Sequence, residues 1–131
     1  MSQLNATITA IQKQDSLHIV TFNAQGFELH MMSLELGSNV IVGANVLLGV
    51  KASSVAIAKE FSGQLSYSNQ LDLEIQNIDK GTLLCSLQLK SNGLELESII
   101  TKASKERMSL QVKGKVTALI KSSDLYIVEI L

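Results

Sequence analysis

The chain has 131 residues, a formal net charge of −1 and 46% hydrophobic residues, with two Tyr, three Phe and no Trp. A nucleic-acid-binding domain usually shows a basic footprint, so the near-neutral charge without a basic run argues against that class. No apolar run approaches the length of a membrane span, and the polar N-terminus does not resemble a signal peptide.

The single cysteine, Cys85, excludes an internal disulfide framework and fits a reducing compartment. We therefore expect a cytoplasmic protein. Because free cysteine behaves as a small apolar side chain, Cys85 is interpreted as a core residue.

The first half of the chain is expected to form short strands. Residues 3–12, 17–22 and 27–33 are rich in β-branched or alternating apolar residues, with turn residues at 13–16 and a hairpin at 23–26. Residues 34–39 are expected to form a short connection with one helical turn. Strands at 40–42 and 45–51 then lead to Lys51, and residues 55–57 are expected to close the first module.

The second half repeats this pattern. Strands are expected at 69–78, 83–89, 94–100, 115–120 and 125–130, with a short helical turn within 101–108. The chain contains no proline, so no strand is confined to a sheet edge by that residue.

The two halves also align residue by residue. Gln3-Leu4 matches Gln70-Leu71 at an offset of 67 residues (70 − 3), and Gly26 matches Gly93 at the same offset. Lys51 matches Lys121 at an offset of 70 (121 − 51). Such self-similarity predicts two copies of one module, at residues 1–60 and 61–131. Each copy is near the lower size limit for an independent core, so we expect the halves to pack on each other or on other subunits.

About five short strands and one short helical connection per module are typical of a small barrel of the OB type. The predicted fold class is therefore all-β, with two tandem OB-like five-stranded barrels and a short helical turn in each.

The aligned turns at Lys51 and Lys121 are the candidate functional feature. In each, an apolar strand runs into a Lys, small hydroxyl residues follow, and a short apolar strand resumes: Val50-Lys51-Ala52-Ser53-Ser54-Val55 and Ile120-Lys121-Ser122-Ser123-Asp124-Leu125. Ammonium, hydroxyl and turn amide donors gathered at one point suit a small, multiply charged oxyanion. The alternative is that both lysines are solvated residues that protect strand edges from aggregation.

These motifs resemble the molbindin, or TOBE, family of molybdate-binding modules. The family opens with a Ser-Ala-Arg-Asn-Gln-Leu type stretch and continues with a Gly-bearing turn, an Ile-Thr-x-x-Ser stretch and an Ile-Lys-Ala-Ser turn. The second half of this chain matches in the same order, with Ser66 to Leu71, Gly81, Ile100 to Ser104 and Ile120 to Ser123. The first half matches at Gln3-Leu4 and at Val50 to Ser53.

The resemblance implies tandem OB-like barrels that assemble into a homo-oligomer, a trimer in the double-module storage proteins, with oxyanion sites where modules meet. It implies molybdate or tungstate as the bound ligand. The residues carried over as oxyanion ligands are Lys121, Ser122, Ser123, Thr101, Ser104, Ser66, Ser68, Lys51, Ala52 and Ser53.

The chain departs from the family at two places. Ser68 occupies the position of the family's Arg, so one permanently charged donor is missing. In the first half, Leu34 and Gly37 stand at the ungapped positions of the Thr-x-x-Ser pair. Either a complete site draws that pair from a second module, or the two kinds of site are unequal.

The predicted function is binding of molybdate or tungstate for intracellular storage, buffering or sensing. The alternative is an OB-type module that binds single-stranded nucleic acid or a protein partner, although stacking aromatics and a basic groove are expected of a nucleic-acid module. A purely structural oligomerisation module is a third reading. No Ser-His-Asp order, glycine-rich phosphate loop or metal-ligand spacing stands out, so the chain is predicted not to be an enzyme and to hold no metal ion.

Overall fold

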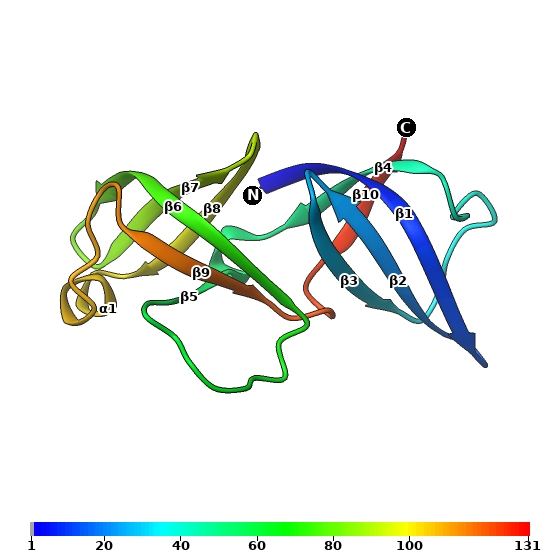
Figure 1. The fold of residues 1–131 in the computed structure, drawn as a ribbon, viewed down its shortest axis with the longest axis horizontal. Helices are drawn as coiled ribbons and strands as arrows, with labels where there is room; N and C mark the ends of the chain where they lie inside the picture. The colour runs from blue at the N-terminus through cyan, green and yellow to red at the C-terminus, as the bar shows by residue number, and fades with distance from the viewer. Residues whose placement is uncertain (1) are drawn as a thin grey trace.

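The computed structural model describes residues 2–131, and its strands form two five-stranded antiparallel sheets that lie along the long axis of the molecule (Figure 1). The first sheet has the order β10-β4-β1-β2-β3 and the second the order β5-β9-β6-β7-β8. The first comprises β1 (Ser2–Gln14), β2 (Leu17–Ala24), β3 (Phe27–Ser33), β4 (Asn45–Val50) and β10 (Tyr126–Ile130). The second comprises β5 (Ala56–Ala58), β6 (Asn69–Lys80), β7 (Leu84–Ser91), β8 (Leu94–Thr101) and β9 (Lys115–Ile120). The all-β prediction with two tandem sheets is confirmed.

The two halves exchange their last strands. β5 follows β4 in the chain but pairs with β9 of the second sheet, and β10 follows β9 but pairs with β4 of the first sheet. The expectation that residues 55–57 close the first module is therefore wrong. The sequence pattern could not reveal this, because each half carries an equivalent short apolar strand that could complete either sheet.

Neither sheet closes into a hydrogen-bonded barrel among the described residues, which corrects the barrel expectation. β3 and β10 are the two edges of the first sheet, and β8 and β5 are the edges of the second. The physical reason is that the third strand of each half makes polar contacts with the other half. On β3, for example, the Met32 N–H donates to the Ser122 carbonyl over 2.9 Å, instead of pairing with β10.

The predicted repeat extends to backbone irregularities. β1 has a bulge between Ile8 and Ala10, and β6 has one between Ile75 and Asn77, 67 residues later. Both long strands change partner near the bulge, which lets one strand serve two neighbours. The hairpins at Gln25-Gly26 and Asn92-Gly93 both have two positive φ angles, as a two-residue primed turn requires.

The helical segments differ from the prediction in the first half. The predicted turn in the second half is confirmed as helix α1 (Lys102–Arg107), but residues 34–39 contain no helix. A 3₁₀ turn, η1 (Ala52–Ser54), lies instead at the first Lys turn. The predicted strand at 40–42 is also absent, and Ile41 and Val42 are more than half exposed, so that segment buries too little apolar surface to be held in a sheet. None of the described helices is long and apolar enough to span a membrane.

Both halves contribute to one hydrophobic cluster, as two undersized modules require. It joins residues such as Ile8, Phe22 and Leu48 of the first half to Leu71 and Ile120 of the second. Cys85 is a free, buried thiol, as expected of a core residue.

Side-chain size distinguishes the two exchanged strands. Tyr126 of β10 lies opposite Gly49, and a Cβ built at Gly49 would lie 2.8 Å from ring atoms of Tyr126 and from a methyl group of Val128. At the equivalent place in the second sheet the sizes are reversed, because Ala56 of β5 lies opposite Leu119. Each closing strand thus fits the sheet of the opposite half.

Candidate functional site

The two Lys turns lie where the chain crosses from one sheet to the other. Lys51 links β4 to η1 and β5, and Lys121 links β9 to the turn before β10. In both, the Lys carbonyl accepts a hydrogen bond over 2.9 Å from the amide three residues later, at Ser54 and at Asp124. Both lysines are exposed, and within residues 2–131 neither ammonium forms an ion pair. The turns therefore present two similar, unneutralised cationic points.

Both Lys turns are fixed by contacts to the third strand of a half. The Ser122 carbonyl accepts from Met32 of β3, and the Val55 carbonyl accepts a 2.6 Å hydrogen bond from the hydroxyl of Ser98 on β8. Ser98 is fully buried, so its hydroxyl can be satisfied only by the protein there. These contacts hold the turn backbone in place before any ligand binds.

The predicted ligands in the turns differ in accessibility. Ser53 and Ser123 are exposed, Ser122 is half-buried, and the Ala52 side chain is buried, so Ala52 can contribute only through its backbone. These hydroxyls and amides lie beside the exposed lysines in sequence and form the donor group that the repeat predicts.

The opening stretch of the second half contains a structural residue that the sequence did not identify. Asn69 is fully buried; its side-chain oxygen accepts from the His30 N–H over 2.7 Å and its amide donates to the His30 carbonyl over 2.9 Å. At the equivalent contact of the first half, the Glu97 N–H donates to the Ser2 hydroxyl over 2.7 Å. The sequence did hold a signal for this role, because Asn69 is a polar residue at a position of β6 where the alternation of the strand places side chains in the core.

Ser66 and Ser68 both precede this anchored residue and are both exposed. Neither donates to or accepts from another described residue, which leaves both hydroxyls open to solvent. Asn69 thus fixes the backbone next to Ser68, and Ser68 itself contributes only a neutral hydroxyl.

Thr101 and Ser104 lie close together at the start of α1. Thr101 is the N-cap residue, and its hydroxyl oxygen accepts from the Ser104 N–H over 3.1 Å. The Thr101 hydroxyl donates to the Ser104 hydroxyl over 2.9 Å, and the Arg107 guanidinium donates to the same oxygen over 3.1 Å. Thr101, and not Ser104, therefore caps α1.

One chain does not bring all the predicted residues together. In Figure 1, α1 lies at one end of the long axis, whereas the two chain crossovers that carry Lys51 and Lys121 lie near its middle. The first half has no substitute at the positions that align with Thr101 and Ser104. Leu34 is 65% exposed but has no hydroxyl, and Gly37 has no side chain. Within a single chain, the Lys turns and the Thr-x-x-Ser pair remain separate groups of donors.

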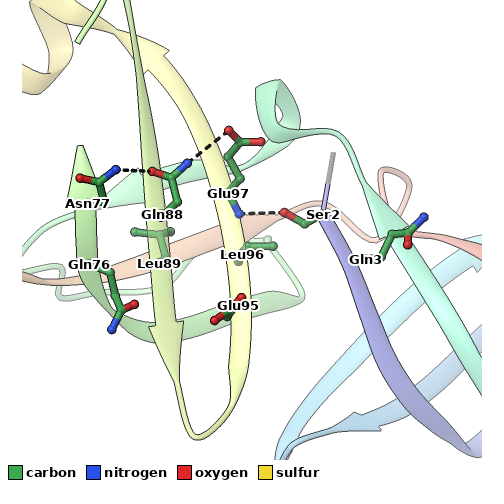
Figure 2. A pocket seen from close by; sticks show the side chains of 9 residues that line it. All are labelled: Ser2, Gln3, Gln76, Asn77, Gln88, Leu89, Glu95, Leu96 and Glu97. Atoms are coloured by element: carbon green, nitrogen blue, oxygen red, sulfur yellow. Dashed lines mark hydrogen bonds between the residues drawn. The ribbon is translucent and has the colours of Figure 1, made fainter. Parts of the chain in front are cut away.

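A groove of about 580 Å³ lies between the halves but does not suit an oxyanion. Figure 2 shows Ser2 of the first half facing Glu97 on β8, with the side-chain amides of β6 and β7 on the other side of that strand. Its charged lining residues are Glu95 and Glu97, both carboxylates. Like charge disfavours a dianion here, so the groove is not the candidate site.

No metal centre competes with this interpretation. Within residues 2–131, no group of three or more His, Cys, Asp or Glu side chains is arranged to hold a metal ion. His30 is engaged by protein groups, since its ring nitrogens lie 3.3 Å from the Thr21 hydroxyl and 3.4 Å from a Glu28 carboxylate oxygen.

Comparison with known proteins gives a likeness of fold. No family model matches the chain, and no curated protein matches it closely enough to count as a relative. A crystal structure of the cytoplasmic molybdate-binding protein ModG, with molybdate bound, superposes with a TM-score of 0.91. The match has 24% sequence identity and covers 96% of this chain and 94% of that one. The chain therefore has the tandem-module fold seen in that molybdate-binding protein, which is the fold that the molbindin and TOBE resemblance implies.

Proposed function

We propose that this protein binds molybdate or tungstate as a member of the molbindin and TOBE family, through the donor groups of its Lys turns and of the Thr-x-x-Ser pair. The observation that carries the proposal is the duplicated Lys turn, with an exposed lysine at each crossover of a fold shared with a molybdate-binding protein. The function is binding for storage, buffering or sensing in the cytoplasm, without catalysis.

The chemistry of the donors supports an oxyanion. Tetrahedral dianions offer four acceptor oxygens, and Lys, Ser and Thr side chains together with turn amides supply matching donors. Hydrogen bonds to a charged acceptor are roughly twice as strong as neutral ones. Rigid turns, held by the Met32 and Ser98 contacts, reduce the cost of ordering these donors on binding.

The separation of the two donor groups within one chain supports an oligomer, and we propose a homotrimer. In such an assembly the Thr101 and Ser104 hydroxyls of one copy complete the Lys turn of another. The repeat boundaries at 1–60 and 61–131 then describe two modules that share strands by exchange.

Calorimetric titration of the purified protein tests the proposal. Molybdate and tungstate should bind, sulfate should bind more weakly because it is the smaller anion and cannot reach all the donors that hold the larger ones, and a short oligonucleotide should not bind. Binding of the oligonucleotide without molybdate or tungstate would instead support the OB-type nucleic-acid module. Absence of heat with all four ligands, confirmed by equilibrium dialysis, would favour a purely structural module.

A further inference from the structure

We propose that Arg107 is an oxyanion-binding residue that adds a permanent positive charge to the Thr101 and Ser104 hydroxyls. The inference rests on the proposed function and adds to it a residue that the family pattern does not mark. Arg107 is the only arginine in the chain. Its guanidinium already reaches the Ser104 hydroxyl over 3.1 Å, so it lies beside the two Thr-x-x-Ser hydroxyls.

The hydrogen bonds around Ser104 leave donors unused. A serine hydroxyl has two acceptor positions and one donor hydrogen. Both acceptor positions of the Ser104 oxygen are taken, one by the Thr101 hydroxyl and one by Arg107. The Ser104 hydrogen and the remaining guanidinium N–H groups are then available to an external acceptor. A group with only donors left suits an anion and does not suit a cation.

The charge of Arg107 is not neutralised within the helix. The only carboxylate of α1, Glu106, lies 3.9 Å from the Lys102 ammonium, and the helix also carries Lys105. Three cations against one carboxylate leave a net charge of +2 on α1. Arg107 is exposed, so an arriving anion can reach it without rearrangement of the core.

The planar guanidinium also explains why arginine, and not lysine, stands at this position. It can donate one N–H to Ser104 and others to two oxygens of the same anion. A lysine ammonium group lacks the fixed, planar arrangement of N–H donors that favours such paired hydrogen bonds. Arg107 thereby holds the Ser104 hydroxyl and contacts the ligand from the same side.

The test is calorimetric titration of molybdate into the full-length protein and into three variants, with sulfate as the comparison anion. Arg107→Gln should weaken molybdate binding roughly ten- to a hundredfold, the range expected for loss of a charged hydrogen bond. Lys105→Gln removes the same charge from the same helix without touching Ser104, and should change the affinity by less than about threefold, because salt screens a charge that does not contact the anion. Arg107→Lys should recover part of the loss.

Circular dichroism and thermal melting of the same samples separate binding from folding. The proposal requires that Arg107→Gln retains the wild-type melting behaviour while it loses affinity. Equal affinities for Arg107→Gln and Lys105→Gln would overturn the proposal. It would also be overturned if Arg107→Gln lost affinity only because it unfolds, while a folded Arg107→Lys kept the wild-type affinity at high salt. Wild-type protein that binds no molybdate would overturn the proposed function as well, whereas tight binding by wild type and Arg107→Gln alike would overturn this inference alone.

Discussion

Replacement of Asn69 by alanine should destabilise the protein more than any other polar substitution at the junction of the halves. The Asn69 side chain is fully buried and satisfies both the N–H and the carbonyl of His30. Its removal leaves two backbone groups without partners, and each unsatisfied group costs about 1–3 kcal/mol. Because His30 is only partly buried, water can offset some of this cost, and we expect a total loss of about 2–4 kcal/mol.

Thermal unfolding at fixed protomer concentration measures this loss, since the stability of an oligomer depends on concentration. For a chain of this size, about 4 °C of melting temperature corresponds to 1 kcal/mol, so Asn69→Ala should lower it by roughly 8–16 °C. The matched control is Ser2→Ala, which removes the equivalent hydrogen bond from the Glu97 N–H and should cost about 1 kcal/mol. If Asn69→Ala were no more destabilising than Ser2→Ala, the two-bond anchor would not hold the halves together as described.

Three further predictions follow from the exchanged strands and the Lys turns. Gly49→Leu should lower the free energy of unfolding in denaturant by about 1–3 kcal/mol, because its Cβ would lie 2.8 Å from Tyr126 and Val128 atoms. Tyr126→Ala in the same chain should recover part of the loss. Wild-type stability of Gly49→Leu alone would contradict the size matching. Lys121→Ala should weaken molybdate binding by roughly ten- to a hundredfold and more than Lys51→Ala does, because only the second half keeps Thr101 and Ser104; unchanged affinity in both variants would place the site elsewhere. Sedimentation should reveal an oligomer, expected to be a trimer, and a stable 14.2 kDa monomer at micromolar concentration would refute this.

Local patterns in the sequence were sufficient for most strands. Alternating apolar residues predicted β1, β6 and β8 closely, and Gly26 and Gly93 marked both hairpins, because these features depend on near neighbours in the chain. The helical turn of the second half was also correctly placed, where Thr101 provides an N-cap. In the first half the same reasoning failed at residues 34–42, where no capping residue aligns with Thr101.

Long-range features could not be obtained in this way. The exchange of β5 and β10 depends on which sheet each strand reaches, and the deciding contacts, such as Tyr126 against Gly49, join residues far apart in the chain. The anchoring role of Asn69 was missed for the same reason, since its partner His30 lies 39 residues away. Nothing in the sequence indicated a role for Arg107, because its reach to Ser104 depends on side-chain conformation and not on a family motif.

The most direct test of the account is a crystal structure of the protein with tungstate, in which anomalous scattering from tungsten locates the bound anion. We expect tungsten beside a Lys turn, within hydrogen-bond reach of the Thr101 and Ser104 hydroxyls contributed by a second copy of the chain. Tungsten bound only in the groove near Glu95 and Glu97, or no ordered tungsten at saturating tungstate, would contradict it.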